Sequence, residues 1–69
     1  MNDEPNQARD VHTAVHDHGP IDAESIARRT RWNRHVVDVA LEIMVENAMV
    51  ARAERADGEP VYRALFGPW

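Results

Sequence analysis

The sequence predicts an α+β domain that is mainly helical, with three helices followed by a small antiparallel β-hairpin. Two observations support this prediction. As far as residue 47, apolar residues recur at spacings of three and four, which is the period of an amphipathic helix. From residue 49 the spacing changes to two, and Asp57 and Gly58 separate two alternating segments, as is typical of a hairpin.

The first helix is expected over residues 6–18. Its apolar stripe consists of Ala8, Val11, Ala14 and Val15. Gly19 and Pro20 should end this helix, because Gly can adopt the left-handed conformation that follows a helix and Pro cannot continue one.

The second helix is expected to follow at once and to end near residue 30. Asp22 is a good N-cap, because its carboxylate can accept a hydrogen bond from a backbone N–H of the first turn. Ile21 can pack on Ile26 as a hydrophobic staple, and it can also add a very short strand beside the hairpin.

The third helix is the longest and is expected over residues 33–47, with Asn33 as its N-cap. At helical spacing it has an apolar face made of Val37, Ala40, Leu41 and Met44. Its opposite face carries His35, Asp38, Glu42 and Glu46. Val39 and Ile43 lie at the fringe and exceed what a small core needs.

The hairpin is expected from strands at 49–55 and 61–66. Pro60 lacks a backbone donor, so it should stand first in the returning strand or at the hairpin edge. The predicted order is therefore helix, short strand, helix, helix, strand, strand.

Length and composition limit the possible functions. The 69 residues permit one domain, expected over residues 6–66 between a flexible segment 1–5 and a tail 67–69. Cysteine is absent, the one serine lies within the second helix and the three glycines are scattered, so we expect neither enzyme activity nor a cofactor. The polar, acidic N-terminus and the lack of a long apolar run lead us to expect a cytoplasmic protein.

The net charge is −4, but residues 25–37 contain no acid and four arginines: Arg28, Arg29, Arg31 and Arg34. Such a patch can attract an anionic partner in spite of the overall charge, and the guanidinium group matches phosphates and guanine edges. The alternative is that the arginines are solvated charges paired with Asp22, Glu24 or Asp38.

Four segments carry a resemblance to a known family. They are GPIDAESIA at 19–27, TRWNRHVV at 30–37, AMVAR at 48–52, and DG at 57–58 with VYRAL at 61–65. With these segments the chain resembles the winged helix-turn-helix domains of small prokaryotic, archaeal and phage transcription regulators, over nearly its whole length. Gly is common in the family where Ala48 stands, so we expect Asn47 to take the positive φ instead. Trp32 replaces an aliphatic residue, and we expect it to fill the core with Tyr62.

The resemblance implies sequence-specific binding of double-stranded DNA. The helix at 33–47 would enter the major groove, and the wing at 55–60 would lie on the backbone. The implied contact residues are Arg28, Arg29, Arg31, Asn33, Arg34, His35 and Arg55. Of these, Arg34 and His35 would reach base edges.

Two features suggest other partners. His12 and His16 are four residues apart, a spacing that can chelate zinc, and His18 lies nearby. No carboxylate or thiolate completes a zinc motif, so we expect these histidines to face solvent and to bind no metal. Phe66 and Trp69 could present an apolar surface to a second copy or another protein. The alternative function is therefore a protein–protein interaction module, an adaptor or a phage-encoded modulator.

Overall fold

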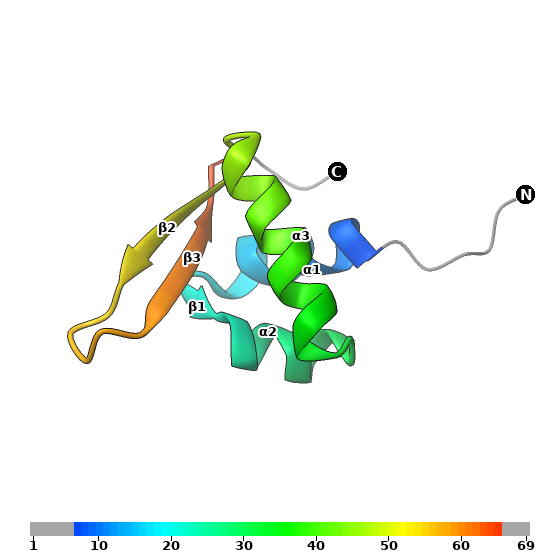
Figure 1. The fold of residues 1–69 in the computed structure, drawn as a ribbon, viewed down its shortest axis with the longest axis horizontal. Helices are drawn as coiled ribbons and strands as arrows, with labels where there is room; N and C mark the ends of the chain where they lie inside the picture. The colour runs from blue at the N-terminus through cyan, green and yellow to red at the C-terminus, as the bar shows by residue number, and fades with distance from the viewer. Residues whose placement is uncertain (1–6, 66–69) are drawn as a thin grey trace, which may run out of the picture.

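Residues 7–65 are described by the computed structural model, and their elements follow the expected order (Figure 1). The helices are α1 (Gln7–His18), α2 (Ala23–Thr30) and α3 (Arg34–Glu46). The strands are β1 (Ile21–Asp22), β2 (Val50–Glu54) and β3 (Pro60–Ala64). The predicted α+β class is confirmed, and the topology is consistent with a winged helix. The expected terminal segments, 1–5 and 67–69, lie outside the described residues.

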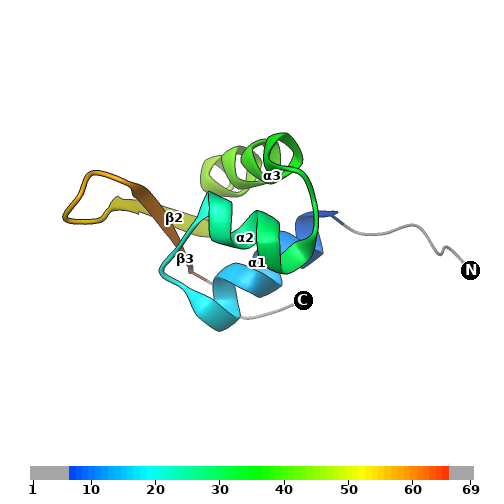
Figure 2. The same ribbon diagram turned by 90° about the horizontal axis from the view of Figure 1, so that it is seen from below.

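The strands form one antiparallel sheet in the order β1-β3-β2. The short strand predicted at Ile21 is present, and it pairs with β3, where Ile21 lies opposite Tyr62. On the other side of β3, Tyr62 lies opposite Arg52. Figures 1 and 2 show the three helices packed together at one end of the molecule and the β2–β3 hairpin projecting from them. The hairpin therefore stands where a wing is expected.

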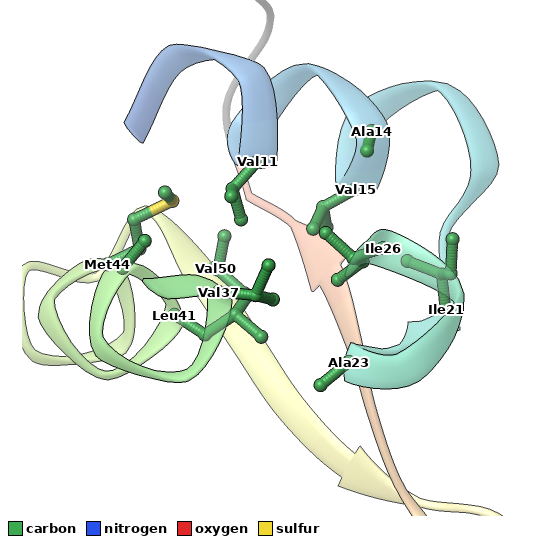
Figure 3. Close-up of a cluster of buried hydrophobic side chains, with 11 residues drawn as sticks. Val11, Ala14, Val15, Ile21, Ala23, Ile26, Val37, Leu41, Met44 and Val50 are labelled. Atoms are coloured by element: carbon green, nitrogen blue, oxygen red, sulfur yellow. The ribbon is translucent and has the colours of Figure 1, made fainter. Parts of the chain in front are cut away.

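A single cluster of aliphatic side chains holds the helices and the sheet together (Figure 3). The predicted apolar face of α3 is buried in it, with Val37 fully covered and Leu41 and Met44 almost so. Trp32 and Tyr62 are half-buried and pack against the cluster, as predicted. The Trp32 indole Nε1 donates a hydrogen bond to Asp10 of α1 at 3.0 Å, so its polar end remains satisfied at the surface.

The predicted helix caps are both confirmed. Asp22 precedes α2 with an extended backbone, and its carboxylate accepts a hydrogen bond from the Ser25 N–H at 3.2 Å. Asn33 precedes α3 and accepts from the Val36 N–H at 2.9 Å. Pro60 is the first residue of β3, also as predicted.

Helix α1 ends at His18, directly before Gly19 and Pro20, as predicted, but Gly19 does not adopt the left-handed conformation expected for it. Among residues 7–65, Gly58 in the hairpin loop is the one glycine with a positive φ, at 90°. Gly19 is required for another reason, because a Cβ there would lie 2.5 Å from the Val15 carbonyl oxygen and 3.0 Å from that of Tyr62. Glycine therefore allows the end of α1 to approach the backbone of β3.

The prediction for Asn47 is also wrong, because Ala48 has the positive φ, at 58°, and Asn47 is at −94°. Two hydrogen bonds close the end of α3, from the Ala48 N–H to Val45 at 3.1 Å and from the Met49 N–H to Met44 at 2.8 Å. This pair is the Schellman motif, which requires the left-handed conformation at the position Ala48 occupies.

The prediction that the three histidines face solvent holds for His16 and His18 but fails for His12, which is 1% exposed. The reason is that α1 contacts α2, α3 and β3. The surface of α1 that these elements cover therefore extends beyond its apolar stripe and includes His12. Desolvation lowers the pKa of His12, and the nearby His16 lowers it further.

We expect Ala48→Gly to stabilise the domain by about 1 kcal/mol, because glycine adopts the left-handed conformation without the clash that alanine suffers. Urea unfolding of the wild type and the variant measures the difference. Ala53→Gly, in the exposed part of β2, is the control and should destabilise. A loss of stability in Ala48→Gly would contradict this account of the end of α3.

Stability should fall as the pH decreases below about 6.5, the ordinary pKa of histidine in an unfolded chain. In that range the unfolded state binds a proton at His12 that the folded state, with its lowered pKa, resists. Unfolding at pH 7.5 and 5.5 measures the loss. His12→Leu should reduce it, whereas His18→Leu, at an exposed position, should leave it unchanged. Equal pH dependence in both variants would argue against His12.

Candidate nucleic-acid interface

The clustered arginines surround the connection between α2 and α3. Arg28 and Arg29 belong to the last turn of α2, Arg31 lies in the turn, and Arg34 is the first residue of α3. All four are exposed. Arg31 adopts a left-handed conformation, with φ at 65°, and its N–H donates to Ala27 at 2.8 Å. This bond ends α2 and reverses the chain, so residues 28–34 lie around one short connection.

Arg34 is held by two carboxylates. Its Nε donates to Asp38, one turn later in α3, at 3.0 Å, and its Nη1 donates to Glu24 of α2 at 3.3 Å. These bonds, the one to Asp38 first, raise the pKa of Arg34. All three side chains are about half exposed, so the pairs are of the solvent-screened kind that contributes little to stability. Arg34 therefore has two of the carboxylate partners that the paired-charge alternative names.

Arg28 and Arg31 differ from Arg34. Within residues 7–65, neither side chain forms a hydrogen bond or an ion pair with a carboxylate. The Arg29 guanidinium lies 3.5 Å from the His18 ring nitrogen, at the end of α1. Among the described residues, these three guanidinium groups therefore have no carboxylate partner.

Asn33 and His35 flank Arg34 at the start of α3. The Asn33 side-chain oxygen is occupied by the helix cap described above. His35 is exposed on the outer surface of the helix. Both residues lie where the sequence predicts, and the hydrogen bond of Asn33 makes it the cap of α3.

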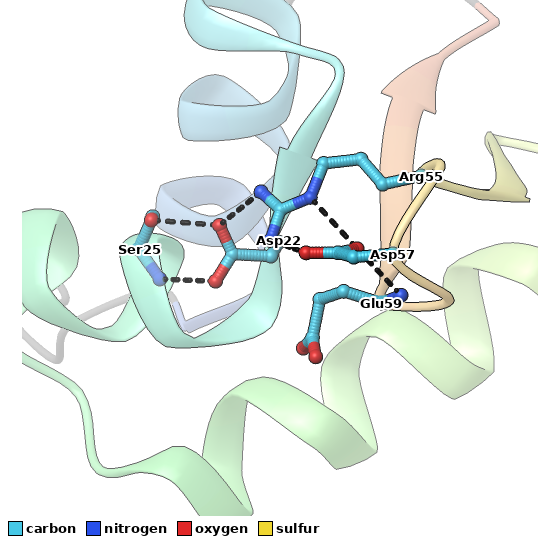
Figure 4. Close-up of polar contacts among 5 residues, drawn as sticks. All are labelled: Asp22, Ser25, Arg55, Asp57 and Glu59. Carbon is cyan, nitrogen blue, oxygen red and sulfur yellow. Dashed lines mark hydrogen bonds and ion pairs between the residues drawn. The ribbon is translucent and has the colours of Figure 1, made fainter.

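Arg55 lies on the hairpin, at some distance along the chain from the other arginines. Its guanidinium is 3.4 Å from Asp57 in the same loop and 3.8 Å from Asp22 at the start of α2 (Figure 4). Asp57 also accepts from the Glu59 N–H at 3.0 Å, and this bond, with Arg55, lowers the pKa of Asp57. Arg55 therefore has carboxylate partners on both sides.

A groove of about 330 Å³ lies between α3 and the hairpin, and three of the six residues that line it are acidic. The residues are Asp38, Glu42, Val45, Glu46, Arg52 and Tyr62. The sequence predicted the acids on the outer face of α3, but the groove depends on the position of the hairpin, which no local pattern indicates. Only the first turn of α3 is therefore basic.

A second groove, of about 300 Å³, lies between the start of α1 and the other side of α3. Its lining contains no Asp, Glu or Arg and includes Ala8, Val36, Val39 and Ile43. Val39 and Ile43 are 43% and 53% exposed. The other apolar residues expected at the surface, Phe66 and Trp69, lie outside the described residues.

Among residues 7–65, no three His, Asp or Glu side chains lie close enough together to hold a metal ion. No helix in the same part of the chain is long and apolar enough to cross a bilayer.

Comparison with known proteins gives no relative from which a function could be transferred: no protein-family model matches the chain, and no curated protein matches it. The function is therefore argued from the fold and its residues.

Proposed function

We propose that this domain binds double-stranded DNA through the α2–α3 connection and acts as a transcription regulator. The observation that carries the proposal is that Arg28, Arg29 and Arg31 are exposed and have no carboxylate partner among residues 7–65. They lie in the last turn of α2 and in the connection that leads to the N-terminus of α3, where the helix dipole adds partial positive charge. Phosphates are attracted to such a site by charge and by counterion release.

The distribution of charged residues along α3 supports the proposed function. Helices are stabilised by acids in the first turn and bases in the last turn. In α3 the first turn has no acid and contains Arg34, and the last turn has no base and contains Glu46. Helix α3 thus carries a base where its stability favours an acid, and an acid where its stability favours a base. Departures of this kind are common at functional sites.

In the proposed complex, Arg28, Arg29 and Arg31 contact phosphates, and the first turn of the helix at 33–47 enters the major groove. Arg34 and His35 then face base edges. The acidic part of α3 must tilt away from the duplex, because Asp38 and Glu42 would otherwise approach the phosphates. The loop at 55–60 lies over the neighbouring backbone.

Arg28→Ala combined with Arg31→Ala should weaken binding to a random-sequence duplex by about tenfold at 0.1 M salt, because two phosphate contacts are lost. The slope of log affinity against log salt should decrease in magnitude by about 2. Fluorescence anisotropy at two salt concentrations measures both. The control is Arg52→Ala with Arg63→Ala, which removes the same charge from exposed hairpin positions. Equal losses of duplex affinity in the two double variants would mean that net charge alone explains the effect. The absence of any complex at low salt would refute the proposal.

The acidic groove favours a second candidate function, the binding of a protein with a cationic surface. Asp38, Glu42 and Glu46 line this groove together with Val45, Arg52 and Tyr62. A positively charged partner would be attracted by the same carboxylates that oppose a duplex.

Asp38→Asn distinguishes the two functions. It removes a negative charge and releases Arg34 from its shorter ion pair, so affinity for the duplex should rise about threefold. Under the second function, the variant should instead weaken binding of an octa-arginine peptide, followed by anisotropy. Asp17→Asn, an exposed acid on α1, is the control for charge alone. A fall in duplex affinity in Asp38→Asn would contradict the proposed DNA-binding surface.

A further inference from the structure

The loop at the tip of the hairpin has its own internal order. The Arg55 N–H donates to the Glu59 carbonyl at 2.9 Å, and the Gly58 N–H donates to the Arg55 carbonyl at 2.9 Å. Asp57 accepts from the Glu59 N–H at 3.0 Å. Gly58, with φ at 90°, allows the chain to turn. These contacts shape the loop, but they do not fix its position relative to the helices.

Arg55 provides a side-chain link between the loop and the start of α2, in addition to the backbone pairing of Asp22 with Val61. Its guanidinium bridges Asp57 in the loop, at 3.4 Å, and Asp22 before α2, at 3.8 Å (Figure 4). Both partners, Asp57 first, raise the pKa of Arg55. A planar guanidinium can serve two carboxylates at once, whereas the ammonium group of lysine acts as a single point charge.

Asp22 is a fixed anchor for this bridge. Its side chain is only 15% exposed, and it accepts from the Ser25 hydroxyl at 2.8 Å and the Ser25 N–H at 3.2 Å. The same residue pairs with Val61 of β3 in the sheet. The bonds from Ser25, more than Arg55, lower the pKa of Asp22, so the carboxylate is charged at neutral pH.

We propose that Arg55 is a positioning residue, which holds the hairpin loop against the start of α2, in place of the direct DNA contact expected from the sequence. Its consequence for binding rests on the proposed DNA-binding function. A loop held at a constant distance from the α2–α3 connection meets the duplex already ordered, so less conformational freedom is lost on binding.

Asp22→Asn tests this role because a direct phosphate contact and a positioning role predict opposite changes in duplex affinity. Removing a negative charge beside a polyanion site should raise affinity if Arg55 contacts phosphate directly. If Arg55 positions the loop, the variant should lower duplex affinity by about threefold, because the bridge loses its anchor. Asparagine still caps α2, so the helix is retained. Asp17→Asn, with the same charge change on α1, should show no loss.

Hydrogen exchange of the Gly58 and Glu59 amides, measured without DNA, provides an independent readout. Exchange should be faster in Asp22→Asn and in Arg55→Gln, and the double variant should be no faster than Arg55→Gln alone. Arg55→Lys should restore only part of the protection. Unchanged exchange in Asp22→Asn, or a rise in its duplex affinity, would overturn the positioning role. If the wild type binds no duplex, the proposed function fails, but the exchange measurement still decides the role of Arg55.

Discussion

The burial of the apolar stripe of α3 is the constraint on which the rest of the structure depends. Val37, Leu41 and Met44 pack against α1, α2 and Val50 at the start of β2, and all of them are almost completely covered. Once this stripe is buried, the helical period sends the polar residues of α3 outward. It also sets the direction in which the chain leaves α3, and hence where the hairpin projects.

This packing divides the surface of α3 into parts with different chemistry. Its first turn adjoins the arginines of α2, its hairpin side carries carboxylates, and its side towards α1 is apolar. The exposed ion pairs of Arg34 join the first two parts. They contribute little to stability, and in the proposed complex a phosphate would compete with them for the guanidinium group.

Predictions that depended on neighbours in the chain were accurate. The caps at Asp22 and Asn33, the turn at Gly58 and the first position of β3 at Pro60 follow from backbone groups within a few residues. Errors arose at His12, where distant segments decide the outcome, and at the ends of two helices. His12 is covered because several elements meet α1, and a Cβ at Gly19 would meet both the Val15 carbonyl of α1 and the backbone of β3. At Ala48, the two hydrogen bonds that close α3 impose a conformation that residue preference alone disfavours.

The sequence by itself determined the order and class of the elements and the cluster of arginines between 28 and 34, because helical period, caps and turn residues act over short distances. Arg34 and Arg55 each have one carboxylate partner close in the chain, Asp38 and Asp57, and only the tertiary structure decided the second partner of each. Glu24 meets Arg34, and Asp22 meets Arg55, across segments whose contact requires the packed core. Side-chain charge acts through space, so its effect at a site depends on neighbours that no local pattern identifies.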